Sequence, residues 1–342
     1  MPKTSKTMPP RPAHDVLRIA TAIVIGGSAW LAVAEVRAQS SPTTYPYEGR
    51  ADWARMPDGR TWGAPSGLKM DPDQRSLWVL ERCGDYSGPG CAESDLPPVL
   101  QFDLSGRLVR SFGAGMFVFP HGLAVDHEGN VWVVDGRGVE GKGHVVVKFS
   151  PEGEVLLTLG QPGVAGEGPY TLNRPSDVAI APNGDIFVVD GHTGMDTNMR
   201  IVKYAPDGTY IKEWGRKGPA PGELNGAHGI AMDSQGRLFV ADRENNRIQI
   251  FDQDGNFVDA WTQFGTPSGL YITPDDVLYV ADYGAGIRIG SARDGRVTRF
   301  IAAANWNTES VRVGEAVAVD ANGVIYVGEN ANKKLMRFDP PR

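Results

Sequence analysis

The chain repeats one short unit six times, and this repetition leaves few folds open to it. Each unit reads as a short apolar strand, a turn that contains glycine, and a second apolar strand that ends in an acidic residue. The units span residues 65–81, 120–135, 175–190, 227–242, 267–282 and 314–329. Such self-similarity is typical of architectures that stack copies of one supersecondary motif.

Two further strands follow most of these units. A third strand runs into an Asp-Gly or Glu-Gly turn, as in residues 145–153, 201–208 and 248–255, and a fourth strand follows in five units. Glycine tolerates the positive φ angles that such hairpin turns require. Four antiparallel strands repeated radially form a β-propeller. The sequence therefore predicts an all-β fold, a six-bladed β-propeller.

The two ends of the chain are expected to meet in this ring. The sixth unit ends at residues 338–342 without a fourth strand, whereas the segment from Tyr45 to Trp53 belongs to no unit. We expect this mature N-terminal strand to close the propeller, because unpaired strand edges invite aggregation. Residues 39–342 would then form a single domain.

The first 38 residues are expected to be a signal peptide. Basic residues precede an apolar run over residues 19–34, and Val36-Arg37-Ala38 has the small-x-small pattern of a cleavage site. The run of about 16 residues is short for a membrane span, although an uncleaved anchor is the other interpretation. We expect a secreted or periplasmic protein without stable membrane insertion after cleavage.

The net charge of the mature chain disfavours some classes of binding partner. The signal segment holds five Lys and Arg and two Asp and Glu, which leaves 29 basic and 39 acidic residues and a net charge of −10. A surface of this sign disfavours nucleic acid and anionic membranes as partners. We expect a small-molecule substrate and a monomeric protein.

The chain has two cysteines, Cys83 and Cys91, in one glycine-rich loop. An exported protein meets an oxidising compartment, where two free thiols would be open to oxidation. The sequence favours a local disulfide over two free thiols.

Three stretches are more specific than the repeat itself. They are residues 119–123 (Phe-Pro-His-Gly-Leu), Asp190-Gly191 together with 200–202 (Arg-Ile-Val), and residues 240–249 (Val-Ala-Asp-Arg-Glu-Asn-Asn-Arg-Ile-Gln). The units resemble NHL repeats, and nearly the whole mature chain resembles the peptidyl-α-hydroxyglycine α-amidating lyase family. The resemblance implies a six-bladed zinc propeller that cleaves an α-hydroxyglycine C–N bond to give an amide and glyoxylate.

The residue that opens the first strand of each unit alternates in type around the predicted ring. In chain order these residues are Ser66, His121, Ser176, His228, Ser268 and Glu315. Alternate blades of a six-fold ring lie about 120° apart, so His121, His228 and Glu315 would converge on the axis. Three protein ligands with an open position predict one catalytic divalent metal ion, zinc or non-haem iron. The alternative is a set of channel residues bonded to water.

At this site the sequence differs from the family that it resembles. The family has three histidine ligands, and His121 and His228 match two of them, whereas Glu315 stands at the third position. The family's structural calcium uses an Asp just after the third His, and the corresponding residue here is Ala316. We therefore do not expect that calcium site.

Residues just after the acid that ends each second strand should surround the metal, since the first two strands of a blade are antiparallel. Arg82 and Arg243 match the family's active-site arginines, which implies carboxylate binding or charge stabilisation; the alternative for each is a surface ion pair. His192 stands where the family has a catalytic Tyr, and it could be a general base, a metal ligand or a solvated loop residue. Tyr283, on the same rim, could replace the missing phenol.

The acids themselves recur in all six units, which indicates a structural role as acceptors for backbone N–H groups rather than catalysis. The leading hypothesis is a metal-dependent lyase or related hydrolase for a small polar, carboxylate-bearing substrate. The alternative is a non-catalytic propeller that binds a partner in the periplasm. A calcium-dependent lactonase is a third possibility, and the two histidines speak against it.

Overall fold

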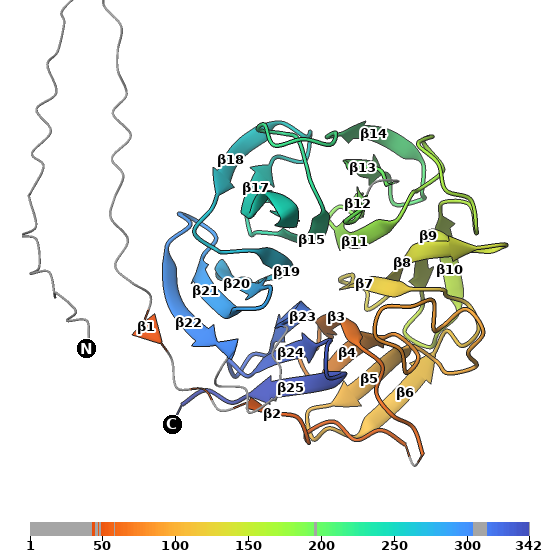
Figure 1. Ribbon diagram of the computed structural model, residues 1–342, viewed down its shortest axis with the longest axis vertical. Helices are drawn as coiled ribbons and strands as arrows, with labels where there is room; N and C mark the ends of the chain where they lie inside the picture. The colour runs from red at the N-terminus through yellow and green to blue at the C-terminus, as the bar shows by residue number, and fades with distance from the viewer. Residues whose placement is uncertain are drawn as a thin grey trace, which may run out of the picture. The chain divides into compact units, whose positions relative to one another are not determined.

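Six sheets surround a central axis, one for each repeat (Figure 1), which confirms the predicted six-bladed β-propeller. The computed structural model describes residues 43–44, 47, 49–57, 59–194, 197–303 and 313–341. The expected signal peptide, residues 1–38, lies outside this range. Among the described residues, no helical segment has the length and apolar character to cross a bilayer.

The first strand of each blade lies nearest the axis and contacts the first strands of both neighbouring blades. These inner strands are β3 (Pro65–Met70), β7 (Pro120–Val125), β11 (Pro175–Ile180), β15 (Ala227–Met232), β19 (Pro267–Ile272) and β23 (Val313–Val319). The second strands are β4 (Ser76–Glu81), β8 (Val131–Val139), β12 (Ile186–Asp190), β16 (Leu238–Asp242), β20 (Val277–Asp282) and β24 (Ile325–Glu329). Each second strand is antiparallel to its inner strand.

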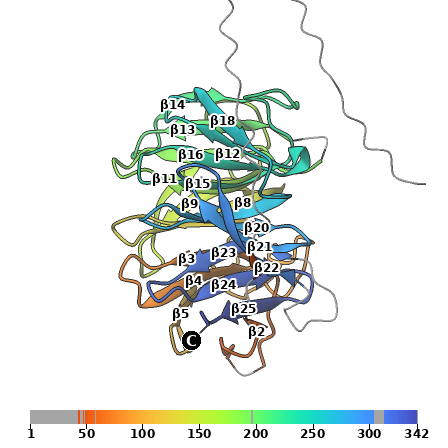
Figure 2. The same cartoon turned by 90° about the vertical axis from the view of Figure 1, so that its left-hand side faces the viewer.

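The outer half of each blade completes the sheet (Figure 2). The third strands are β5 (Val99–Asp103), β9 (Lys142–Phe149), β13 (Arg200–Tyr204), β17 (Arg247–Phe251), β21 (Gly286–Ser291) and β25 (Lys334–Phe338). The fourth strands of blades one to five are β6 (Leu108–Phe112), β10 (Val155–Leu159), β14 (Tyr210–Trp214), β18 (Phe257–Trp261) and β22 (Val297–Ala302). A short 3-10 helix, η1 (Arg243–Asn245), follows β16.

The N-terminal residues supply two short outer strands. β2 (Gly49–Arg50) pairs antiparallel with β25 and is the fourth strand of the sixth sheet. β1 (Thr43–Thr44) pairs parallel with β22 of blade five. The segment expected to complete the sixth blade therefore pairs with it through two residues.

Six hydrophobic clusters fill the spaces between neighbouring blades. Side chains along a strand alternate between its two faces, so each second strand contributes side chains to two clusters. Val131 and Val133 of β8 pack toward blade one, whereas Trp132 and Val134 pack toward blade three. Because both faces are covered, the second strands are apolar at nearly every position, as in the buried run Leu77–Leu80.

The acids that end the second strands hold the loops that lead into the inner strands. Asp135 accepts the backbone N–H groups of Val118 and Phe119 at 2.8 and 2.6 Å. Asp282 accepts that of Thr266 at 2.8 Å in the same way. These contacts confirm the predicted structural role and hold the segments that lead into the inner strands of blades two and five.

Candidate metal centre

The openings of the inner strands form a ring at one end of the axis, and its serines tie neighbouring blades together. The Ser66 hydroxyl donates to the Pro120 carbonyl oxygen at 2.9 Å, and the Ser176 hydroxyl donates to that of Ala227 at 3.0 Å. The bulky residues of the ring, His121, His228 and Glu315, line one axial cavity. Ser66 and Ser176 line the same cavity, so the serines both join blades and border the axis.

Three histidines meet at this end of the axis. His121 and His228 come from β7 and β15 and are each 2% exposed, whereas the partly buried His192 comes from the loop after β12. One ring nitrogen from each lies within 4.8 Å of the other two. The Nε2 atoms of His121 and His192 are 3.1 Å apart.

The opposite ring nitrogens of these histidines have partners in the protein. The His121 Nδ1 donates to the Ser176 carbonyl oxygen at 2.7 Å, which leaves the lone pair on Nε2. The His228 Nδ1 lies 3.2 Å from the Ser268 hydroxyl, and the His192 Nδ1 lies 2.9 Å from that of Thr193. Such contacts orient an imidazole and select its tautomer, as they do in metal sites.

Burial is the main cause that lowers the pKa of each of these three histidines well below its ordinary value. The Arg82 and Arg243 guanidinium groups lower it further for His121 and His228 respectively. The imidazoles are therefore neutral at physiological pH, which is the form that binds a metal ion.

The loop that presents His192 depends on Gly191. Gly191 has φ +153°, and a Cβ at this position would collide with the carbonyl oxygen of Asn198. The backbone N–H of His192 then donates to the Thr197 hydroxyl at 2.9 Å. This turn places His192 against His121, with ring centroids 4.8 Å apart.

Glu315 reaches the cluster from β23 and is paired with Arg82. One carboxylate oxygen bonds Nη2 of Arg82 and lies 3.7 Å from Nε2 of His121, and the other lies 3.8 Å from Nε2 of His228. The ring position expected to complete the ligand set is thus close to both histidines, but it already holds a cation. Glu315 is not part of the three-nitrogen group.

The other two nitrogens of Arg82 also have partners. Nε donates to the carbonyl oxygen of Pro120 at 3.3 Å, and Nη1 donates to that of Tyr86 at 2.9 Å. The guanidinium also lies 4.1 Å from the centre of the Phe119 ring. All three guanidinium nitrogens of Arg82 therefore have protein partners. Arg82 positions Glu315, and it has no pair of free nitrogens with which to bind a substrate carboxylate.

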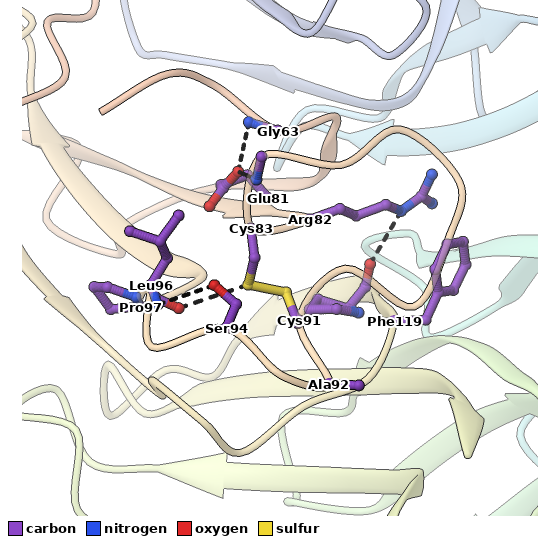
Figure 3. The surroundings of a disulfide bond; sticks show 12 residues. Gly63, Glu81, Arg82, Cys83, Cys91, Ala92, Ser94, Leu96, Pro97 and Phe119 are labelled. Carbon is purple, nitrogen blue, oxygen red and sulfur yellow. Dashed lines mark hydrogen bonds between the residues drawn. A yellow bond between two sulfur atoms is a disulfide. The ribbon is translucent and has the colours of Figure 1, made fainter. Parts of the chain in front are cut away.

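The disulfide lies directly beside Arg82. Cys83 and Cys91 are bonded, which confirms the predicted pairing. In Figure 3, Arg82 extends from the start of this loop toward Phe119, while Glu81 turns the other way to Gly63. The crosslink thus restrains the loop that carries Arg82.

Arg243 and Tyr283 lie together on another part of the rim. The Arg243 guanidinium is 5.2 Å from the centre of the Tyr283 ring, and its Nε makes a long 3.4 Å contact with Glu244. Arg243 is close enough to all three histidines to lower the pKa of each. No other hydrogen bond of its guanidinium occurs among the described residues, so its two terminal nitrogens are available to a ligand.

Four charged residues near the cluster become evident only in the structure. Lys69 of β3 and Asp177 of β11 line the same axial cavity as His121, His228 and Glu315. Arg137 and Arg174 stand beside the histidine cluster, where Arg137 lowers the pKa of His121 and Arg174 lowers that of His192. Arg137 directly follows Gly136, the rim residue of blade two, and that adjacency is the signal that could have identified it.

The donor set fits a metal ion. The Nε2 of His228 is buried and has no hydrogen-bond partner, an arrangement that costs free energy unless a ligand or ion satisfies it. Two nitrogen ligands of a tetrahedral zinc ion lie about 3.3 Å apart, because each Zn–N bond is about 2.0–2.1 Å. The 3.1 Å between His121 and His192 matches this spacing. The three histidines could therefore form a metal site.

Comparisons with known proteins agree with the repeat and the fold. The NHL repeat family matches residues 224–251. Human NHL repeat-containing protein 3 is 32% identical over 265 residues, which cover 72% of this chain and 74% of that protein. A gluconolactonase from Xanthomonas campestris shares the fold with a TM-score of 0.61 at 18% identity, over 90% of this chain and 99% of that one.

Two further relatives are named as peptide-amidating enzymes. The Caenorhabditis elegans protein named "Probable peptidyl-alpha-hydroxyglycine alpha-amidating lyase" is 30% identical over 68% of this chain and 67% of its own length. The Xenopus laevis peptidyl-glycine alpha-amidating monooxygenase B is 31% identical over 82% of this chain, which spans 34% of that longer protein. The chain belongs to the family of NHL-repeat six-bladed propellers that includes the peptidyl-α-hydroxyglycine α-amidating lyases.

Proposed function

We propose that this protein is a metal-dependent lyase that cleaves the C–N bond of an N-acyl-α-hydroxyglycine. The observation that carries the proposal is the convergence of three neutral histidines, one with an unsatisfied buried Nε2, beside an arginine with free nitrogens. The lyase names of relatives support the reaction class. A propeller that only binds a partner protein has no need of this set.

His121, His192 and His228 hold the ion in this proposal. From the sequence we expected Glu315 as the third ligand, and His192 could be a base, a ligand or a solvated loop residue. The geometry favours His192 as the ligand, because its Nε2 lies 3.1 Å from that of His121. We propose zinc, with iron as the alternative. A bound divalent ion would lower the pKa of a coordinated hydroxyl group and stabilise the resulting negative charge.

Glu315 is then the general base. Its carboxylate lies between Nε2 of His121 and Nε2 of His228, at 3.7 and 3.8 Å, where the substrate hydroxyl would be held. Glu315 takes the hydroxyl proton, the C–O bond becomes the carbonyl of glyoxylate, and the C–N bond breaks. Glu315 then gives this proton to the amide nitrogen, so the products are an amide and glyoxylate and Glu315 is again a carboxylate. Arg82 fixes the orientation of the carboxylate.

Arg243 binds the substrate carboxylate. Its terminal nitrogens are free among the described residues, and it borders all three histidines. A guanidinium fork matches a carboxylate bidentately. Tyr283, against which Arg243 lies, restricts the guanidinium to the rim.

The expected location and assembly state belong to this proposal. The Cys83–Cys91 disulfide supports a secreted or periplasmic protein, since such bonds persist in oxidising compartments. We propose that residues 1–38 are cleaved and that residues 39–342 act as a monomer. Sequencing the N-terminus of the exported protein and measuring its sedimentation test both points.

The function is tested by metal analysis and by turnover of α-hydroxyhippurate, an N-acyl-α-hydroxyglycine. We expect about one zinc or iron ion per chain and release of benzamide and glyoxylate in equal amounts. His228→Ala removes both metal and turnover, whereas the exposed turn residue His127 offers a matched control, and His127→Ala retains both. Wild-type protein without stoichiometric metal after incubation with zinc or iron would support the binding-module alternative instead.

A further inference from the structure

We infer that Arg137 and Arg174 form a second anion-binding subsite beside the histidine cluster, selective for substrates with an acidic group in the acyl portion. The inference rests on the proposed function, because it names a substrate class for the same site. It goes beyond the carboxylate that Arg243 binds, since it assigns a second anionic group to the preferred substrate.

The guanidinium of Arg174 is the first observation. Its Nε is buried, and neither this atom nor any other of the side chain has a hydrogen-bond or ion-pair partner in the described part of the chain. A buried charged donor without a partner costs free energy, and a bound anion removes that cost. The side chain belongs to the residue that immediately precedes β11.

The backbone holds Arg174 in an uncommon conformation. Arg174 has φ +61°, and its N–H donates to Nδ1 of His144, which itself has φ +55°, at 3.1 Å. Left-handed conformations are unfavourable for such side chains and are kept where the surrounding structure imposes them, often at functional sites. The guanidinium occupies space left by Gly194, where a Cβ would lie 2.7 Å from Nη1 of Arg174.

Arg137 lies on the neighbouring blade and faces the same region. Its guanidinium is 4.1 Å from the centre of the Phe119 ring, as that of Arg82 is, so one ring separates the two cations. Nη1 of Arg137 donates to the carbonyl oxygen of Ser87 at 2.7 Å. The Arg137 guanidinium forms no ion pair within 4.0 Å among the described residues.

The like charges of these arginines repel one another. Burial lowers the pKa of Arg137, and the Arg174 and Arg82 guanidinium groups lower it further, while Asp85 and Glu315 oppose them. Glu315 is already bonded to Arg82. A chain with seven more acidic than basic residues thus gathers unpaired cations at one place, which favours an anionic ligand there.

Arg137 and Arg174 lie beside two of the three histidines that Arg243 also borders. Arg243 is the foremost charged neighbour of His228, whereas Arg137 acts on His121 and Arg174 acts on His192. In this inference, a substrate whose carboxylate binds Arg243 directs its acyl portion toward Arg137 and Arg174. A side-chain carboxylate at that end gains charge-assisted hydrogen bonds.

The test uses two unreactive ligands that lack the α-hydroxyl group, N-acetyl-Glu-Gly and N-acetyl-Gln-Gly, titrated calorimetrically into the metal-loaded protein. We expect the wild type to bind the Glu ligand at least about tenfold more tightly, as expected for charge-assisted bonds. Arg137→Gln and Arg174→Gln each reduce this preference, and the double variant abolishes it. Arg174→Lys retains part of it. Arg107→Gln, at an exposed arginine of the first blade, leaves it unchanged.

Equal affinities in the wild type, failure of the Glu ligand to bind, or a preference that persists in the double variant would each overturn the inference. Thermal unfolding and metal content of each variant separate a loss of the subsite from a loss of the fold. The proposed function fails in a different way, through absence of glyoxylate release from α-hydroxyhippurate while the Glu ligand keeps its preference.

Discussion

Arg82 and Glu315 form an ion pair between the first and the sixth blade, although 233 residues separate them in the chain. The pair joins the two blades that meet where the propeller closes, and it lies within 4 Å of the histidine cluster. Correct closure of the ring and correct placement of the proposed base therefore depend on the same contact.

Arg82→Gln tests this relationship. We expect kcat to fall about 10- to 100-fold, because a misplaced catalytic group loses its near-attack geometry, while KM and metal content stay nearly constant. Arg82→Lys should recover part of the loss. A raised KM with an unchanged kcat would show that Arg82 binds the substrate carboxylate instead, as the family resemblance implied.

Arg243→Gln should raise KM, whereas Arg82→Gln should lower kcat. Loss of a charge-assisted bond to the substrate carboxylate costs about 1.5–3 kcal/mol, so we expect KM to rise by about one to two orders of magnitude with metal retained. Steady-state kinetics with α-hydroxyhippurate measures this. If KM does not change, the carboxylate is held elsewhere on the rim.

Removal of the disulfide should weaken the Arg82 loop and the fold. The bond closes a loop between residues eight apart, for which chain-entropy arguments give a stabilisation of about 2–3 kcal/mol. We expect the Cys83→Ser/Cys91→Ser double variant to lose about this much in denaturant unfolding and to turn over more slowly. Unaltered stability and kcat would show that the loop is held by its other contacts alone.

Asp177 predicts a pH dependence of stability. Burial raises its pKa to about 6, above that of an unfolded chain, so the folded protein binds this proton more tightly. The stability contributed by protonated Asp177 is full below about pH 4 and is lost as the pH rises through about 6. Relative to Asp177→Asn, the wild type should lose about 1 kcal/mol in free energy of unfolding between pH 5 and pH 8.

Urea unfolding of both proteins at the two pH values provides the measurement. Asparagine retains an oxygen that can accept the backbone N–H of Ile230, which Asp177 accepts at 3.0 Å. Because Asp177 raises the pKa of Lys69, whose pKa burial lowers, both proteins are compared in a Lys69→Met background. Identical pH slopes for the two proteins would show that Asp177 does not titrate in this range.

The repeat made the fold and part of the site predictable from the sequence. His121, His228 and Glu315 occupy equivalent positions at the openings of inner strands, so one alignment of units placed all three on the axis. The acids of the second strands were predictable for the same reason. Equivalent positions in a closed repeat have equivalent neighbours.

Contacts outside the repeat were not predictable. His192 reaches the cluster through a loop whose path depends on Gly191 and on the Thr197 hydroxyl, and neither belongs to the repeated unit. Arg174 precedes its unit and owes its direction to a positive φ. Arg82 pairs with Glu315 only when the first and last blades meet. No local sequence pattern predicts this contact.

Metal content distinguishes His192 from Glu315 as the third ligand of the proposed ion. We expect purified His192→Ala to lose its zinc or iron, whereas Glu315→Gln keeps about one ion per chain and loses at least about 100-fold in kcat, as expected for removal of a general base. His127→Ala serves as the control that keeps both. Full metal occupancy in His192→Ala together with metal loss in Glu315→Gln would show that Glu315, and not His192, is the third ligand.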